Sequence, residues 1–125
     1  MTEPARPRIL VVDDQSEMAT VIADALVDYG YTAYAAYSGS RALEMLREER
    51  MDAVVTDLTM PRVNGLDVLR ASQRLDPSRP VILMTGFGAV DSALQAFEVG
   101  AHQYILKPFR IEALAAVLRK ALAHG

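Results

Sequence analysis

The chain has 125 residues, 51% of them hydrophobic, with a formal net charge of −3 at pH 7 and no cysteine. This size and composition predict one globular domain and argue against a disordered chain. Without cysteine the chain can form neither disulfides nor thiolate metal sites, and its negative net charge offers no positive field for direct binding of nucleic acid. The sequence also contains no apolar run of about 18 residues that could span a membrane.

The first residues, Met1 to Pro7, lack the apolar segment of a signal peptide. We therefore expect a loose lead-in over residues 1–7 and a folded domain over residues 8–123. The absence of cysteine suits a cytoplasmic protein, and it would also suit others. Whether the domain acts alone or is part of a longer protein is open at this point.

Five short segments predict strands over residues 8–12, 32–36, 53–56, 81–84 and 103–106. The first, third and fourth are apolar on both faces, and the signal over residues 32–36 is weaker. Each strand is followed by a segment whose apolar residues have helical spacing. The expected helices run from an N-cap at Ser16 to a closing Gly30, from a cap at Ser38 or Ser40, and over residues 65–75, 89–99 and 111–123. Residues 58–64 and 76–80 are expected to form loops.

The spacing also indicates which helix residues face the sheet. In the first helix these are Met18, Val21, Ile22, Ala25, Leu26 and Tyr29. In the last helix they are Ile111, Leu114, Ala115, Leu118 and Leu122. The outer side of the last helix is then also apolar, with Ala113, Ala116, Val117 and Ala121.

Strand and helix alternate five times, which is the pattern of a doubly wound α/β fold with a parallel sheet and helices on both faces. Right-handed connections leave two common strand orders, and five strands suit the order 2-1-3-4-5. In this order the crevice that binds ligands lies between strands 1 and 3. Asp13 and Asp14 follow the first strand and Asp57 follows the third, so three carboxylates are expected to meet there.

Three carboxylates at close range repel each other, and a divalent cation would remove that repulsion. Oxygen ligands without nitrogen or sulfur suit Mg²⁺. A carboxylate can also attack phosphorus and form an aspartyl phosphate. Thr85 and Lys107 end the two neighbouring strands and would offer a hydroxyl and an ammonium group to the phosphoryl group. A cis bond between Lys107 and Pro108 would be one way to turn the lysine into the crevice.

Short motifs at four strand ends carry a resemblance to a known family. They are VVDD at 11–14, DLTMP at 57–61 with Gly65, MTG at 84–86, and GA at 100–101 with Tyr104 and KPF at 107–109. With these motifs the chain resembles the receiver domain of two-component response regulators over roughly residues 8–123. Segments 81–88 and 91–93 are most similar to receivers of enhancer-binding transcription activators.

The resemblance implies a flavodoxin-like fold and a signalling role, with no enzymatic activity beyond the domain's own phosphorylation and dephosphorylation. Asp57 would accept a phosphoryl group from a histidine kinase or a phosphotransfer protein. Asp14, Asp57 and the main-chain carbonyl of Thr59 would bind Mg²⁺ directly, and Asp13 would bind it through water.

Three further side chains would complete the phosphoryl site and its switch. Lys107 would pair with the phosphoryl group, and Thr85 would form a hydrogen bond with it. Tyr104 would reorient when Thr85 moves. The resemblance implies that this change controls an effector domain or an output protein.

Charged residues are distributed unevenly along the chain, with 22 in residues 1–80 and 7 in residues 81–125. Together with the apolar outer side of the last helix, this indicates an interface, either in a homodimer or with an effector, that phosphorylation would tighten. The resemblance points the same way, because the family often pairs through its fourth helix, fifth strand and fifth helix. The alternative is that the alanines are simply good helix formers on an exposed surface.

Two other classes of function remain open. A phosphorylation-independent binding module would be favoured by the loss of a site residue, and none is lost. A small enzyme could also use this fold. However, a flavin phosphate prefers a hydroxyl- and glycine-rich loop where the chain has Asp13 and Asp14, and a phosphatase with an aspartate nucleophile prefers a second carboxylate where the chain has Thr59.

Overall fold

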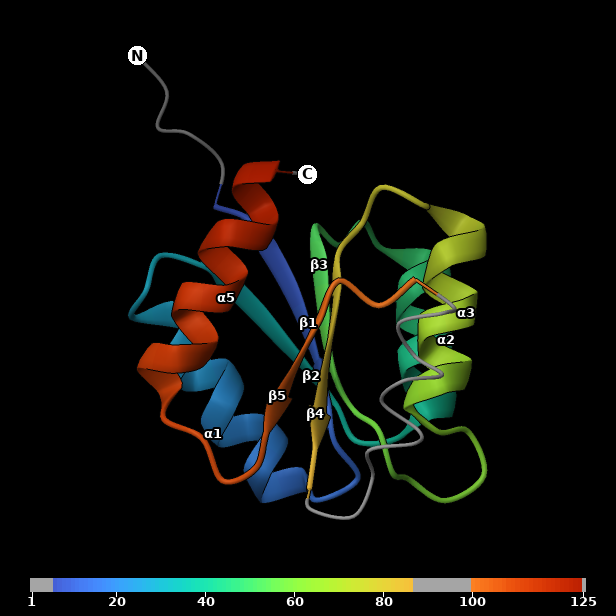
Figure 1. The fold of residues 1–125 in the computed structure, drawn as a ribbon. Helices are drawn as coiled ribbons and strands as arrows, with labels where there is room; N and C mark the ends of the chain where they lie inside the picture. Colours follow the sequence, from blue (N-terminus) through green and yellow to red (C-terminus); the bar gives the residue numbers. More distant parts are fainter. Residues whose placement is uncertain (1–5, 87–99, 125) are drawn as a thin grey trace.

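Five parallel strands form one sheet in the computed structural model of the chain, which describes residues 6–86 and 100–124 (Figure 1). The elements in chain order are β1 (Arg8–Val12), α1 (Ser16–Val27), β2 (Thr32–Ala36), α2 (Gly39–Glu48), β3 (Ala53–Asp57), α3 (Gly65–Leu75), β4 (Val81–Thr85), β5 (Gln103–Leu106) and α5 (Ile111–His124). The helix expected over residues 89–99 and most of the expected lead-in lie outside the described residues. Among the described residues, no helix combines the length and the apolar character needed to cross a membrane.

The strand order is β2-β1-β3-β4-β5, which confirms the predicted order. All four neighbouring pairs are parallel, so the carboxyl ends of the strands share one edge of the sheet. The register pairs Val12 with Thr56 and Thr85 with Leu106 near that edge. The residues that follow β1, β3, β4 and β5 are therefore brought together.

Helices cover both faces of the sheet, and each face has its own core. Helices α1 and α5 lie on one side and helices α2 and α3 on the other (Figure 1). The first core contains Ile9, Val11, Val55, Ile82 and Met84 from the strands. The second contains Leu10, Val12, Val54, Val81 and Leu83. Successive residues of a strand point to opposite faces, so strands buried on both sides need apolar residues at nearly every position.

Helix α1 is turned differently from the prediction. Its buried residues are Ala19, Ile22, Ala23 and Leu26. Met18, Val21 and Tyr29 were expected in the core, but they are 39%, 64% and 41% exposed. The small side chains of Ala19 and Ala23 let the helix backbone approach the sheet, and this moves the larger Met18 and Val21 to the outside.

Both ends of α1 also differ from the prediction. The N-cap is Gln15 and not Ser16, which is the first helical residue. The carboxylate of Asp13 accepts a hydrogen bond of 3.0 Å from the Gln15 N–H, and this turn places the helix start one residue early. The helix ends at Val27, three residues before Gly30, whose φ of 96° is the left-handed conformation that favours glycine.

The predicted starts of α2, α3 and α5 are confirmed. Ser38 caps α2, and its hydroxyl accepts a hydrogen bond of 3.1 Å from the N–H of Arg41. In α5, Leu114, Ala115 and Leu118 are buried as predicted, but Ile111 and Leu122 are only half-buried. The prediction was wrong for two residues that we expected on the outer side of α5. Ala121 is buried and Val117 is half-buried against the core, because the helix presents a broad stripe to the sheet.

A buried arginine fixes the edge of the sheet opposite the carboxylates. Arg79 lies in the expected loop over residues 76–80 but is only 6% exposed. Its Nε donates to Ser72 Oγ at 2.8 Å, and its Nη1 and Nη2 donate to the carbonyls of Met51 and Ser72. Burial lowers the pKa of Arg79. The guanidinium thus joins the C-terminal end of α3 to the loop before β3, a role that the sequence did not indicate.

Candidate functional site

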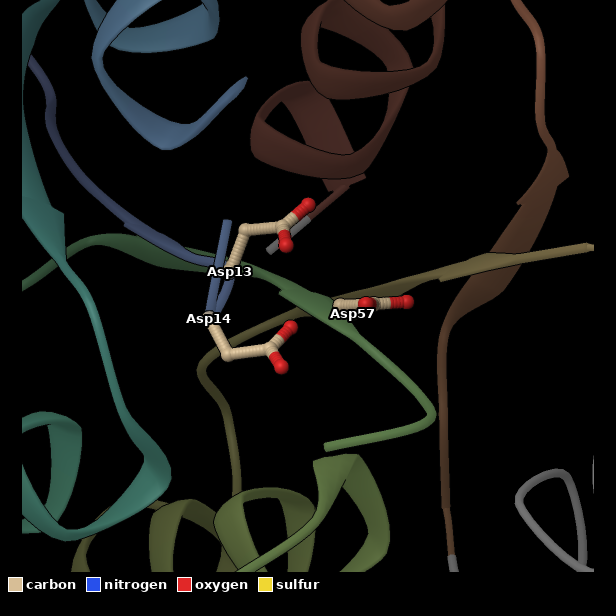
Figure 2. A group of neighbouring side chains, drawn as sticks. All are labelled: Asp13, Asp14 and Asp57. Atoms are coloured by element: carbon tan, nitrogen blue, oxygen red, sulfur yellow. The ribbon is translucent and has the colours of Figure 1, made fainter. Parts of the chain in front are cut away.

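Three carboxylates meet at the carboxyl ends of β1 and β3. Asp13 and Asp14 follow β1, and Asp57 is the last residue of β3. One oxygen from each of the three side chains lies within 4.8 Å of the others, and Figure 2 shows the arrangement. Asp13 is buried, Asp57 half-buried and Asp14 exposed, so the group is open to solvent on one side. The predicted convergence of these residues is confirmed.

Lys107 reaches the same group from the end of β5. Its Nζ lies 2.9 Å from Asp13 Oδ2 and 3.5 Å from Asp57 Oδ2. The main-chain N–H of Lys107 donates to the carbonyl of Thr85 at 2.7 Å, which fixes the residue beside β4. The peptide bond between Lys107 and Pro108 is cis. The structure therefore places one cation against two of the three carboxylates.

Thr85 ends β4 on the opposite side of Asp57 from β1. It is 3% exposed, and its hydroxyl donates to the carbonyl of Gly86 at 3.4 Å, a long hydrogen bond. Tyr104 pairs with Leu83 and Leu106 pairs with Thr85, so Thr85 and Tyr104 point to the same face of the sheet. Tyr104 is the second residue of β5 and not its end, and it is 39% exposed.

The loop after β3 lies beside Asp57. Leu58 and Met60 are buried in the core below α2 and α3, and Thr59 between them is exposed. A hydrogen bond of 2.9 Å from the Gly65 N–H to the Leu58 carbonyl closes the loop. A Cβ on Gly65 would collide with the Asp57 carbonyl and lie 2.7 Å from Leu58 Cα, so this close return of the chain requires glycine.

The surroundings of Asp57 oppose its ionisation. Burial raises the pKa of Asp57 most, and the nearby Lys107 ammonium lowers it. Asp13 and Asp14 raise it further by charge repulsion. A hard divalent cation among the three carboxylates would relieve this repulsion, and a set of oxygen donors is what Mg²⁺ prefers. The residues present therefore fit the predicted metal.

An apolar groove next to this site was not predicted as such. Its volume is about 490 Å³, and it is lined by Met18, Val21, Ile22, Ala25, Lys107, Pro108, Phe109 and Ile111. The groove runs between α1 and the start of α5 and reaches the site through Lys107. The signal was present in the sequence as the extra apolar residues of α1, but helical spacing assigned them to the core.

Comparison with known proteins gives one consistent result. The family described as "Response regulator receiver domain" matches residues 9–119. The transcriptional regulatory protein ZraR of Escherichia coli K12 is 40% identical over 116 residues, which cover 93% of this chain and 26% of ZraR. The DNA-binding transcriptional regulator NtrC of the same strain is 34% identical, over 93% of this chain and 25% of NtrC. The chain thus spans about a quarter of the length of these relatives.

The solved structures agree. A crystal structure of a response regulator receiver domain protein from Clostridium thermocellum has a TM-score of 0.90 and 32% sequence identity, and the match covers 94% of this chain and 95% of that one. The shared fold, the family match over residues 9–119 and the identity to ZraR lead to the same conclusion. The chain belongs to the response regulator receiver domains of two-component systems, which are signalling domains.

Proposed function

We propose that this receiver domain accepts a phosphoryl group on Asp57 from a histidine kinase or a phosphotransfer protein, in a transfer that depends on Mg²⁺. The observation that supports this most directly is the convergence of Asp13, Asp14 and Asp57 with Lys107 at one edge of the sheet. A carboxylate with an ammonium group within reach is suited to attack phosphorus and to hold the product.

In the proposed transfer, an Asp57 carboxylate oxygen forms a bond to phosphorus while the bond from phosphorus to the donor's histidine nitrogen breaks. Asp14, Asp57 and the main-chain carbonyl of Thr59 would hold Mg²⁺ directly, with Asp13 acting through water. The ion would offset the negative charge that the carboxylates and the phosphoryl oxygens share. Lys107 would pair with the transferred group.

The same geometry supports a proposal for the switch. Within residues 6–86 and 100–124, the hydroxyl of Thr85 forms one hydrogen bond, and at 3.4 Å it is long, so a phosphoryl group on Asp57 would offer it a stronger acceptor. Tyr104, on the same face of the sheet, would then move into the space that Thr85 leaves. A local charge that biases two packings of one element is sufficient for a signal.

The groove suggests where the phosphoryl donor binds. It is apolar, it is bordered by Val21 on α1 and Phe109 before α5, and it ends at Lys107 beside Asp57. A partner helix seated in such a groove by its apolar face would bring a phosphohistidine close to the carboxylates. We propose this groove as the contact for the kinase or phosphotransfer protein.

Our proposal for the output of the domain is based on its relatives. ZraR and NtrC are transcriptional regulators, so we propose that this domain, with bounds near residues 8–123, controls transcription in the cytoplasm through an effector domain or protein. The receiver would not contact nucleic acid itself, because the chain has a net charge of −3.

The central proposal is tested with acetyl phosphate as the donor and intact mass spectrometry as the readout. The parent chain should gain one phosphoryl group only when Mg²⁺ is present. Asp57→Asn should gain none, while Asp52→Asn, a change at an acid on the opposite edge, should behave as the parent. Equal labelling of Asp57→Asn, or labelling that a chelator does not reduce, would rule the proposal out.

A further inference from the structure

The loop that follows Asp57 rests on the N-terminus of helix α2, where residue 39 is glycine. A Cβ atom built on Gly39 would collide with the carbonyl oxygen of Val63, and it would lie 2.6 Å from Val63 Cγ1 and 2.7 Å from Val63 Cβ. A neighbour cannot accept a Cβ at such distances without moving. The loop can therefore approach α2 this closely only because residue 39 has no side chain.

Both ends of the same loop are fixed by other contacts. The Gly65 N–H donates to the Leu58 carbonyl at 2.9 Å, and Leu58 and Met60 are 4% and 7% exposed. The carboxamide of Asn64 caps α3 by accepting a hydrogen bond of 3.0 Å from the Asp67 N–H. The contact of Val63 with Gly39 holds the part of the loop directly before this cap.

The backbone in the middle of the loop is in an unfavourable conformation. Arg62 has a φ of 65°, the left-handed region that is disfavoured for residues with a Cβ. Such a conformation persists only where surrounding contacts impose it. Arg62 is exposed, so its own side chain does not supply those contacts, whereas the next residue, Val63, packs on Gly39 and the core.

We propose that Gly39 is a positioning residue for the metal site. Through Val63, the N-terminus of α2 sets the conformation of the loop and thereby the position of the main-chain carbonyl of Thr59. This inference rests on the proposed Mg²⁺-dependent transfer, in which that carbonyl is the one direct ligand not carried by a carboxylate. Mg²⁺ demands near-ideal octahedral geometry, so a shifted carbonyl weakens binding.

The test is a Mg²⁺ titration of the unphosphorylated protein, followed by NMR shifts of the Asp14 and Asp57 amides. In Gly39→Ala the new Cβ pushes the Val63 backbone away from α2, and the apparent affinity for Mg²⁺ should fall about tenfold, the usual scale for loss of a contact that orients a ligand. Gly30→Ala is the matched control. It strains the chain at a φ of 96° and meets no atom within 4 Å, so it lowers stability without touching the loop.

A folded Gly39→Ala variant with parental Mg²⁺ affinity would overturn the inference, and so would an equal loss of affinity in Gly30→Ala. If Gly39→Ala does not fold, Val63→Gly decides. That change removes the side chain that packs on Gly39 without crowding the helix, so weaker Mg²⁺ binding supports the inference and parental binding overturns it. A parent chain that binds no Mg²⁺ would instead defeat the proposed function, which the parent titration shows separately.

Discussion

Lys107 Nζ lies 2.9 Å from Oδ2 of Asp13, a carboxylate that is fully buried. The two residues are 94 positions apart in the chain, so this ion pair joins the end of β5 to the end of β1. Removing one partner of such a pair leaves a buried charge without compensation, which is more costly than the pair itself is stabilising. The proposed metal would bind at the same carboxylates, so the lysine and the metal ion are alternative ways to compensate their negative charge.

We therefore predict that Lys107→Met lowers the free energy of unfolding by about 2 kcal/mol in the presence of a chelator, less than for a fully enclosed pair because Lys107 is partly exposed. Saturating Mg²⁺ should reduce the difference from the parent. Lys107→Arg, which keeps the charge, should lose less. Urea unfolding of the three proteins with and without Mg²⁺ measures this. A Lys107→Met variant as stable as the parent would show that the ion pair contributes nothing.

A second prediction follows from the pKa of Asp57, which burial raises above its ordinary value, with Lys107 opposing and the two neighbouring aspartates reinforcing the shift. The folded protein then binds the proton on Asp57 more tightly than the unfolded chain does. Stability from this group is greatest below the ordinary carboxyl pKa and falls as the pH rises through the raised value. Asp57→Asn removes the ionisation, so without metal it should be more stable than the parent at pH 7 by about 1 kcal/mol.

This gain should shrink at pH 4, where the parent's Asp57 is more protonated. Denaturant unfolding at both pH values, in a chelator, gives the comparison. Added Mg²⁺ should stabilise the parent at pH 7 more than it stabilises Asp57→Asn. A gain that is the same at both pH values would mean that the ionisation of Asp57 is not its source.

The strands and the site were predictable because their signals are local. A buried parallel strand needs apolar residues on both faces, and the carboxylates follow those strands directly, so the topology alone brings Asp13 and Asp57 together. The buried side of α1 was not predictable in the same way. Its sequence has apolar residues on several sides, and only contact with the sheet selects Ala19 and Ala23 over Met18 and Val21.

Contacts between segments far apart in the chain could not be predicted from the sequence either. Arg79 lies in a polar, proline-rich turn where an exposed side chain is expected. It is buried because Ser72 and Met51 supply three acceptors for its guanidinium group. The close approach of Val63 to Gly39 depends on how α2 and the loop after β3 are placed relative to each other. The spacing of residues within either segment does not predict this placement.

The groove next to Lys107 gives a third prediction. Val21 lines it and is 64% exposed, so Val21→Glu would place a charge in the proposed contact without disturbing the core. Phosphotransfer from a histidine kinase that phosphorylates the parent should slow at least about tenfold, since a buried charge opposes docking. Phosphorylation by acetyl phosphate should be unchanged, because a small donor needs no groove.

Val27→Glu serves as the control, because Val27 is on the same helix, is 41% exposed and does not line the groove. It should leave both reactions at the parental rate. Equal rates of kinase transfer to Val21→Glu and to the parent would exclude the groove as the docking site.

The switch gives a fourth prediction. Thr85→Ala should still be phosphorylated on Asp57, because the nucleophile is the Asp57 carboxylate and not the Thr85 hydroxyl. Its conformational response should be weaker, since the hydrogen bond that would draw residue 85 toward the phosphoryl group is absent. NMR shifts of Tyr104 and Leu106 on adding beryllofluoride report this response. Shifts as large as in the parent would contradict a role for Thr85, and Thr85→Ser, which keeps the hydroxyl, should restore them.

The last prediction concerns the interface on β5 and α5 that we expect from the sequence. A hollow of about 240 Å³ lies between the two elements, lined by His102, Gln103, Ala116, Val117 and Lys120. Val117 is half-buried against the core, so a charge there would disturb the fold. Ala116 is exposed and lines the same hollow, which makes Ala116→Glu the better test of the surface. Leu75→Glu is the control, since Leu75 is 52% exposed at the end of α3 on the other face of the sheet.

If phosphorylation tightens a symmetric contact through this surface, beryllofluoride with Mg²⁺ should raise the sedimentation mass of the parent chain toward that of a dimer. A contact that buries about 800 Å² on each partner would be normal for such an association. Ala116→Glu should abolish the increase, because it places two like charges near each other across a two-fold axis. Leu75→Glu should show the parental increase. A parent that stays monomeric with the mimic, together with an Ala116→Glu variant that keeps full effector output, would show that the signal leaves the domain elsewhere.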